Sequence, residues 1–175
     1  MSISIRLICG LAALAVWGCG RSAYPTLKEG DAAPDFTLPA DGGQAVRLSE
    51  FRDSQVVVLY FYPKDQTPGC TKQACGFRDG MSEYVRRGVA VFGISVDSVE
   101  SHRAFKEKQH LNFTLLSDDA KKVSREYGVL NKLGFASRVT FLVGKDGRIV
   151  KIFRDFDPAA NAAQVLDALP AAGAR

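Results

Sequence analysis

The sequence has two cysteines five residues apart, Cys70 and Cys75, in a setting that favours thiol chemistry. Apolar residues at three- and four-residue steps after Pro68 predict a helix that begins near Cys70. Unpaired backbone N–H groups and the positive end of the helix dipole stabilise a thiolate at such a position, and a thiolate is a nucleophile. Thr67 places a hydroxyl where it can bond the sulfur or a bound oxygen atom. Pro63 and Pro68 limit the backbone freedom of the loop between them.

An alternative interpretation is a stabilising disulfide between Cys70 and Cys75. Ideal helix geometry separates Cα atoms five residues apart by about 8.7 Å, whereas a disulfide requires Cα atoms within about 7 Å. On one intact helix the two cysteines therefore cannot bond. Gly76 and Gly80 each weaken this helix by about 1 kcal/mol relative to Ala. We therefore expect Cys70 and Cys75 to form a disulfide only when the helix opens, and we prefer this interpretation to that of a static structural disulfide.

The element that positions Cys70 is the run from Val56 to Tyr62, which is apolar or aromatic throughout. Such a run, ended by Pro63, is typical of a strand buried on both faces, as in a parallel sheet covered by helices. Sheets of that kind carry their chemistry where the strands end. Tyr60 and Tyr62 share one face of this strand, where they either line the approach to Cys70 or belong to the core.

The rest of the chain alternates strand and helix patterns. An Asp-Gly-Gly turn between residues 33–38 and 45–48 predicts an N-terminal β-hairpin. Further strands are expected at 89–96, 112–116, 139–143 and 148–153, and further helices at 98–108, 118–127 and 161–169. This order predicts an α/β domain with a thioredoxin-like fold, in which helices flank a central mixed β-sheet.

Composition indicates one globular domain with an appendage. The chain has 175 residues, of which 46% are hydrophobic and 24% charged. A formal net charge of +4, without a basic run interleaved with aromatics, gives no reason to expect a nucleic-acid partner.

The N-terminus has the pattern of an export signal. An apolar stretch from Leu7 to Trp17 follows Arg6; it suits a signal-peptide core and is shorter than the roughly 20 residues of a membrane span. Val-Trp-Gly-Cys19 resembles a bacterial lipobox, in which Cys19 is lipid-modified and becomes the mature N-terminus, although the bulky Trp17 departs from that pattern. A plain secretory signal or an uncleaved anchor is the alternative.

This pattern divides the chain into a signal peptide (1–18), a tether (19–29) and one domain (30–175). We expect an exported lipoprotein, anchored to a membrane and facing the periplasm or the cell exterior. Cys70 and Cys75 are then the only thiols left in the mature protein, and their electron donor must work outside the cytoplasm.

The active loop resembles a known family. Pro63-x-x-x-Thr67-x-x-Cys70 is similar to the active-site motif of the peroxiredoxins. The longer Tyr-Pro-Lys-Asp-x-Thr-Pro-Gly-Cys-Thr, with Cys75 five residues on, resembles the bacterioferritin-comigratory (Q-type) subgroup. The resemblance extends over residues 30–169.

The resemblance implies a thiol peroxidase that reduces hydrogen peroxide and organic hydroperoxides. Cys70 would be the peroxidatic cysteine and form a sulfenic acid. Cys75 would be the resolving cysteine and convert it to an intramolecular disulfide, which a thioredoxin or thioredoxin-like reductant reduces. The resemblance implies no metal or organic cofactor. We expect a monomer held at the membrane by the lipid on Cys19.

A cysteine held as a thiolate favours a permanently charged neighbour, and arginine is the side chain that always carries its charge. Arg138 precedes the strand 139–143, and Arg-x-Thr-Phe-Leu-Val resembles the family segment whose arginine contacts the catalytic sulfur and the peroxide. By this resemblance Thr67, Arg138 and the backbone N–H of Cys70 hold the peroxide. Arg78 and Arg154 are the alternatives.

Two other classes of protein use close cysteines on a similar fold. Membrane-anchored copper-binding or metallochaperone proteins have Cys-x-x-x-Cys spacing and a distal histidine, and disulfide reductases have Cys-x-x-Cys. Here the spacing is longer and no histidine follows His110. We expect His102 and His110 to lie on the solvated surface and not to bind metal.

Overall fold

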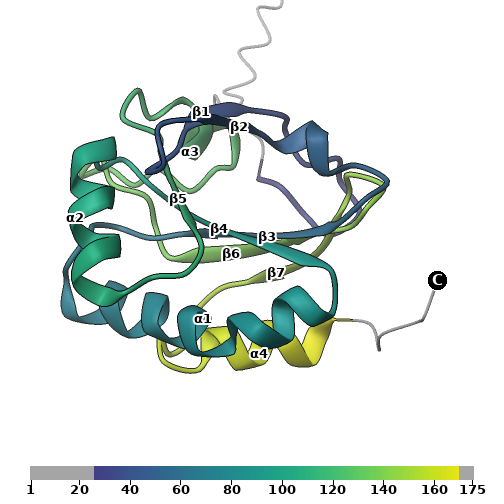
Figure 1. The fold of residues 1–175 in the computed structure, drawn as a ribbon. Coiled ribbons are helices and arrows are strands. Elements are labelled where there is room, and N and C mark those ends of the chain that lie inside the picture. Colours follow the sequence, from purple (N-terminus) through teal and green to yellow (C-terminus); the bar gives the residue numbers. More distant parts are fainter. Residues whose placement is uncertain (1–25, 170–175) are drawn as a thin grey trace, which may run out of the picture.

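A computed structural model of the chain describes residues 26–169 (Figure 1). One five-stranded sheet has the order β5-β4-β3-β6-β7, and β1 and β2 form a separate two-stranded sheet. The expected signal peptide, Cys19 and most of the expected tether fall outside the described residues.

The central strand is β3 (Val56–Phe61), in which every residue after Val56 is buried. It pairs in parallel with β4 (Val89–Ser95) and antiparallel with β6 (Val139–Val143). The sheet is therefore mixed. The prediction of a strand covered on both faces is confirmed.

The sheet is completed by one strand at each edge. β5 (Thr114–Ser117) runs parallel to β4, and β7 (Ile149–Phe153) runs antiparallel to β6. The β6–β7 turn uses Gly147 at φ +75°, a conformation that favours glycine, as its Asp-Gly sequence predicts.

Helices cover the sheet on the side that carries the cysteines. α1 (Pro68–Arg86) and α4 (Asn161–Ala168) lie side by side below the sheet in Figure 1, and α2 (Val99–Gln109) stands at its end. The alternating side chains of β3 divide between two core clusters. Val58 and Tyr60 pack towards α1, whereas Val57 and Leu59 pack towards the opposite layer.

That opposite layer contains the N-terminal hairpin, β1 (Thr37–Pro39) and β2 (Ala45–Arg47), followed by the short helix η1 (Leu48–Phe51). The predicted hairpin is confirmed, although its first strand is shorter than expected. Domain contacts start before this hairpin, because Leu27 is buried and Glu29 Oε1 accepts a hydrogen bond from the backbone N–H of Ile152 in β7.

The helix expected from residue 118 begins later, as α3 (Lys122–Glu126). Lys121 precedes it in the left-handed region, at φ +60°. The carboxylate of Asp118 instead accepts hydrogen bonds from the N–H groups of Val123 and Ser124. Asp118 thus satisfies the free donors of the helix start from outside the helix.

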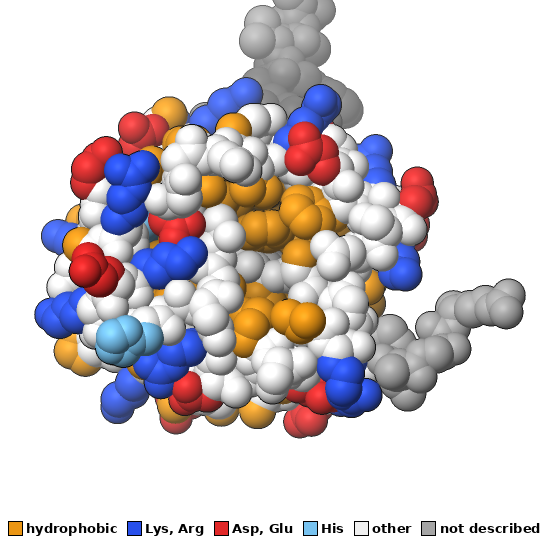
Figure 2. All heavy atoms as spheres, viewed as in Figure 1, with side chains coloured by type: hydrophobic (Ala, Val, Ile, Leu, Met, Phe, Trp, Pro, Cys, Tyr) orange, Lys and Arg blue, Asp and Glu red, His pale blue; other side chains and the backbone are white. Residues whose placement is uncertain are grey.

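In the part of the chain that the structure describes, no helix combines the length and apolar character needed to cross a bilayer. Figure 2 shows acidic and basic side chains interspersed around the rim of one face. Apolar side chains gather in the hollow at the centre of this face, between the two layers of Figure 1.

Candidate active site

Cys70 occupies the third position of α1, as the sequence predicts. Thr67 is the N-terminal capping residue, in an extended conformation, and its carbonyl oxygen accepts the N–H of Thr71 at 2.9 Å. Pro68 suits the first helical position because it has no N–H to leave unpaired. Only 1% of Cys70 is exposed. The sulfur is therefore held at the positive end of a 19-residue helix and is shielded from bulk water.

Arg138 reaches this sulfur from the neighbouring strand. Its Nη2 donates to Cys70 Sγ at 3.2 Å. The reach follows from the strand register, because Phe61 at the end of β3 pairs with Val139 at the start of β6. A side chain at Gly69 would crowd the guanidinium, since its Cβ would lie 3.3 Å from Nη2.

The two alternative arginines lie elsewhere. Arg78 donates to Asp79 and to the carbonyl oxygen of Gln109. Arg154 is exposed, just after β7. Of the three candidates, the structure brings Arg138 to the sulfur of Cys70.

The guanidinium of Arg138 is itself held by a buried amide chain. Nη1 donates to Gln73 Oε1, and Gln73 Nε2 donates to Asn161 Oδ1 at 2.9 Å. The same Asn161 oxygen accepts from Thr140 Oγ1 at 2.8 Å. Sequence reasoning missed Gln73 and Asn161. The available signal was a polar residue on the apolar face of the helix, one position before the buried Ala74.

Cys75 lies further along the same unbroken helix. Cys70 and Cys75 are both free thiols, which agrees with the distance that an intact helix imposes. Cys75 is half-buried, and its thiol lies 3.9 Å from Gln109 Oε1 at the end of α2. Forming a disulfide requires α1 to release this contact.

Thr67 and Pro63 shape the loop between β3 and α1. The Thr67 hydroxyl donates to the carbonyl oxygen of Lys64 at 3.1 Å, so its hydrogen points into the loop. The hydroxyl oxygen remains an acceptor. Pro63 is half-buried and begins the loop two residues after Phe61.

Tyr60 and Tyr62 belong to the core cluster that contains Cys70. Each is 1% exposed, and their rings are stacked with centroids 5.4 Å apart. Burial raises the pKa of both phenols well above the ordinary value. Of the two alternatives for Tyr60 and Tyr62, the structure supports membership of the core.

The expectation of a solvated His102 is also wrong, whereas His110 is exposed as expected. His102 is fully buried, with Nδ1 2.9 Å from Asp65 Oδ2 and Nε2 3.2 Å from the carbonyl oxygen of Leu116. Its partner Asp65 comes from the active loop, so the helical pattern around His102 contained no sign of it. Within residues 26–169 no cluster of three or more histidine, cysteine or acidic side chains is arranged to hold a metal ion.

Asp65 ties the active loop to α2. Its carboxylate accepts from Tyr62 Oη at 2.7 Å and from Ser101 Oγ at 2.7 Å, in addition to facing His102. Burial alone would raise the pKa of Asp65, but hydrogen bonds from His102, Tyr62 and Ser101 outweigh it and lower that pKa. Asp65 therefore holds the loop that carries Thr67 to Tyr62 and to α2.

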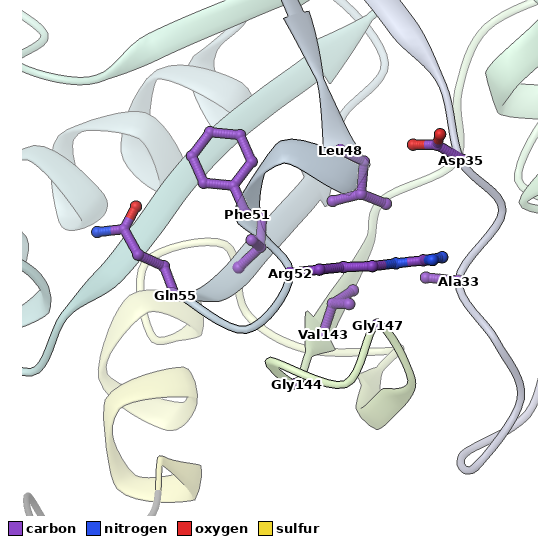
Figure 3. Close-up of a pocket in the computed structure, with 10 residues that line it drawn as sticks. Ala33, Asp35, Leu48, Phe51, Arg52, Gln55, Val143, Gly144 and Gly147 are labelled. Atoms are coloured by element: carbon purple, nitrogen blue, oxygen red, sulfur yellow. The ribbon is translucent and has the colours of Figure 1, made fainter.

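The pocket in Figure 3 is separate from this site. It is lined by Leu48, Phe51, Val57 and Val143, among others. These side chains pack on the hairpin side of the sheet, whereas Cys70 packs on the α1 side. We assign this pocket no part in the thiol chemistry.

Comparisons with known proteins agree with this geometry. The AhpC/TSA family matches residues 29–152. Peroxiredoxin Bcp of Escherichia coli K12 is 47% identical over 137 residues, which cover 74% of this chain and 87% of that protein.

Two solved structures are similar over most of their length. Peroxidoxin BcpB from Mycobacterium tuberculosis has a TM-score of 0.76 and 36% identity, with 81% of this chain and 96% of that chain covered. The bacterioferritin comigratory protein of Xanthomonas campestris has a TM-score of 0.72 and 34% identity, with 76% and 88% covered. The fold and the resemblance predicted from the sequence are confirmed. The chain belongs to the AhpC/TSA family, among its Bcp and Q-type peroxiredoxins, and is a thiol-dependent peroxidase.

Proposed function

We propose that Cys70 is the peroxidatic cysteine of this peroxidase. The observation that carries the proposal is the Arg138 guanidinium 3.2 Å from a buried sulfur at a helix N-terminus. Both the guanidinium and the helix end favour the thiolate over the thiol. No other cysteine among residues 26–169 has both features.

In the proposed reaction the Cys70 thiolate attacks the terminal oxygen of a hydroperoxide. The S–O bond forms as the O–O bond breaks, and the departing oxygen takes up a proton and leaves as water or an alcohol. The cysteine is oxidised to a sulfenic acid and the peroxide is reduced.

Three groups hold the peroxide in this proposal. The Thr67 hydroxyl donates its own hydrogen to the carbonyl oxygen of Lys64, so its oxygen is free to accept a hydrogen bond from the hydroperoxide O–H. Arg138 and the backbone N–H of Cys70 donate to the oxygen atoms and stabilise the charge that develops on the departing one. Pro63 limits movement of the loop. The X. campestris relative is described as reducing alkyl peroxides, which supports organic hydroperoxides beside hydrogen peroxide as substrates.

Cys75 then acts as the resolving cysteine. Its thiolate attacks the sulfenic sulfur, the S–S bond forms, and the hydroxide that leaves is protonated to water. Because α1 keeps the two cysteines apart, its first turns must unwind for this step. A thioredoxin or thioredoxin-like protein returns both cysteines to thiols.

We also propose, from the sequence of residues 1–29 alone, that the protein is exported and anchored. The apolar stretch 7–17 acts as the signal, lipid on Cys19 holds the membrane, and the residues after it are the tether. In this proposal the domain works as a monomer outside the cytoplasm.

The test of the two cysteine roles is a single-turnover measurement with hydrogen peroxide and an alkyl hydroperoxide. We expect Cys70→Ser to consume neither. Cys75→Ser should consume one equivalent of peroxide and stop at the sulfenic acid, which a dimedone adduct detects by mass spectrometry. Equal single-turnover rates for the two variants would show that the roles are wrongly assigned.

A further inference from the structure

A chain of buried polar side chains leads from β6 through Asn161 and Gln73 to Arg138, which contacts the sulfur of Cys70. Thr140 in β6, Asn161 at the start of α4 and Gln73 in α1 are each 0% exposed. Gln73 and Asn161 are 88 residues apart in sequence, and their amides meet at 2.9 Å. Burying polar groups costs free energy unless they are paired, and Asn161 Nδ2 is buried with no hydrogen-bond partner among the described residues, so this chain needs an explanation beyond packing.

The chain has a direction, because an amide has a donor end and an acceptor end. Asn161 Oδ1 accepts from both Thr140 Oγ1 and Gln73 Nε2. The NH2 end of Gln73 therefore faces Asn161, and its oxygen faces the guanidinium of Arg138. If the amide of Asn161 were reversed, its NH2 group would face the NH2 group of Gln73.

We propose that Asn161 is a positioning residue for peroxide reduction. It touches neither the sulfur nor the peroxide and acts through Gln73 on Arg138. By setting the orientation of the Gln73 amide, it gives Arg138 one fixed acceptor at Nη1 and so directs Nη2 at Cys70. The inference rests on the proposed roles of Cys70 and Arg138.

The competing explanation is that Asn161 only joins α4 to α1. Two other bonds already do so: Tyr84 Oη donates to the carbonyl oxygen of Ala162 at 2.7 Å, and Arg87 Nη1 donates to that of Leu166 at 3.1 Å. Both lie beyond the active end of α1, with no bonded path to Arg138. Tyr84→Phe therefore provides a matched control that weakens the same helix contact.

The experiment places Asn161→Leu, Asn161→Asp and Tyr84→Phe in the Cys75→Ser background. Stopped-flow rates of sulfenic acid formation are measured with hydrogen peroxide, the rate of Cys70 alkylation by iodoacetamide is followed against pH, and thermal melting is recorded. The pH dependence of alkylation reports directly on the Cys70 thiolate. A merely structural role of Asn161 would leave this pH dependence unchanged.

We expect Asn161→Leu to slow sulfenic acid formation by between about tenfold and a hundredfold, the usual result of a misplaced catalytic group. Its alkylation profile should move to higher pH. Asn161→Asp keeps an acceptor facing both Thr140 and Gln73 and should recover most of the rate. Tyr84→Phe should melt at a lower temperature yet react at the parent rate.

A folded Asn161→Leu with the parent rate and alkylation profile would overturn the inference. If Asn161→Leu does not fold, Thr140→Val provides the test. This variant keeps the shape of the Thr140 side chain but removes one of the two donors that orient Asn161. Sulfenic acid formation at the parent rate in Thr140→Val would also overturn the inference. Arg138→Met in the same assay distinguishes a failure of the proposed role of Arg138 from a failure of the inference about Asn161. A fast Arg138→Met contradicts the proposed role of Arg138, whereas a slow one beside an unaffected Asn161→Leu contradicts the inference alone.

Discussion

Arg138 and Cys70 are 68 residues apart in sequence and meet in one hydrogen bond. The guanidinium donates Nη2 to the sulfur of Cys70 and Nη1 to the Gln73 oxygen, so it is oriented before any peroxide binds. A donor oriented in advance stabilises developing charge without reorganising during the reaction. The catalytic contribution of Arg138 should therefore come from both its charge and its geometry.

Replacing Arg138 by methionine should slow peroxide reduction by about 10²- to 10³-fold, the usual cost of losing one oriented donor. Alkylation of Cys70 should also require higher pH, because the thiolate loses its cation. The fold should persist, since Arg138 is only half-buried. Stopped-flow kinetics, alkylation rates and circular dichroism measure the three effects.

Arg78→Met is the matched control for Arg138→Met. It removes an arginine that bonds Asp79 and Gln109 instead of Cys70. Its single-turnover rate with peroxide should equal that of the wild type. Equal losses in both variants would mean that the net charge near α1, and not the contact with the sulfur, controls the reaction.

Asp65 leads to a prediction about acid stability. Its pKa is lowered in the folded protein from an ordinary value of 3.8, so the folded state favours the carboxylate. The stability that Asp65 contributes is complete above that ordinary value and is lost as the pH falls through the lower folded pKa. Asp65→Asn should therefore reduce the free energy of unfolding at neutral pH by about 1 to 3 kcal/mol.

Urea unfolding at neutral and acid pH tests the role of Asp65. The deficit of Asp65→Asn should shrink as the pH falls, because the wild type then loses the same carboxylate. Asp119→Asn changes an exposed carboxylate and should show no deficit at either pH. A deficit of Asp65→Asn that stays constant down to acid pH would show that charge at Asp65 is not what stabilises the loop.

Helix α1 has two halves with different attachments. Its first half carries both cysteines and is bonded to the start of α4 through Gln73 and Asn161, whereas Tyr84 near the other end is bonded to Ala162. The glycines between the two halves also allow close packing: a Cβ at Gly76 would lie 3.5 Å from that of Ala162. The half that must open for disulfide formation is thus the half without the Tyr84 anchor.

Oxidation should unwind the first turns of α1 and leave the sheet unchanged. The separation of about 8.7 Å between the Cα atoms of Cys70 and Cys75 in an ideal helix exceeds the reach of a disulfide, about 7 Å. Hydrogen bonds lost on opening have a net worth of about 0.5 to 1.5 kcal/mol each, a cost that disulfide formation can offset. Amide hydrogen exchange should become fast from Thr71 onward in the oxidised protein, with residues 56–61 still protected.

The same exchange experiment has an internal comparison. Cys75→Ser treated with peroxide carries an oxidised Cys70 but cannot form the bridge, so its α1 should remain protected. Identical exchange in reduced and disulfide-bonded wild type would exclude an intramolecular bridge through an opened helix. An intermolecular disulfide would then be the arrangement to seek.

At the scale of the whole molecule, the first residues that the structure describes already pack on β7. Leu27 is buried and the N–H of Gly30 donates to the carbonyl oxygen of Ile149 at 2.8 Å. The proposed tether therefore attaches at the edge of the sheet opposite β5.

Changing Cys19 to alanine should release the protein from the membrane fraction without altering its peroxidase rate. The physical reason is that in the proposed arrangement the lipid on Cys19, and not the domain, supplies the membrane affinity. Fractionation of producing cells, with mass spectrometry of the N-terminal residue, measures the effect. Retention of Cys19→Ala in the membrane would indicate an uncleaved anchor instead of a lipid.

The sequence by itself determined the elements and the chemistry of the loop. A seven-residue apolar run ended by Pro63 predicts β3, and the breakers after it predict a helix beginning near Cys70. These features are local, since side-chain periodicity and backbone restriction act over a few residues. The start of α3 was misplaced because Asp118 caps that helix from a distance.

Only the tertiary structure decided which polar groups meet. The antiparallel register of β3 and β6 selects Arg138 over Arg78 and Arg154. Packing of α4 on α1 brings Asn161 to Gln73, just as the docking of α2 on the active loop buries His102. Partners so far apart in sequence leave no local pattern, because their pairing depends on how whole elements pack and not on the residues beside them.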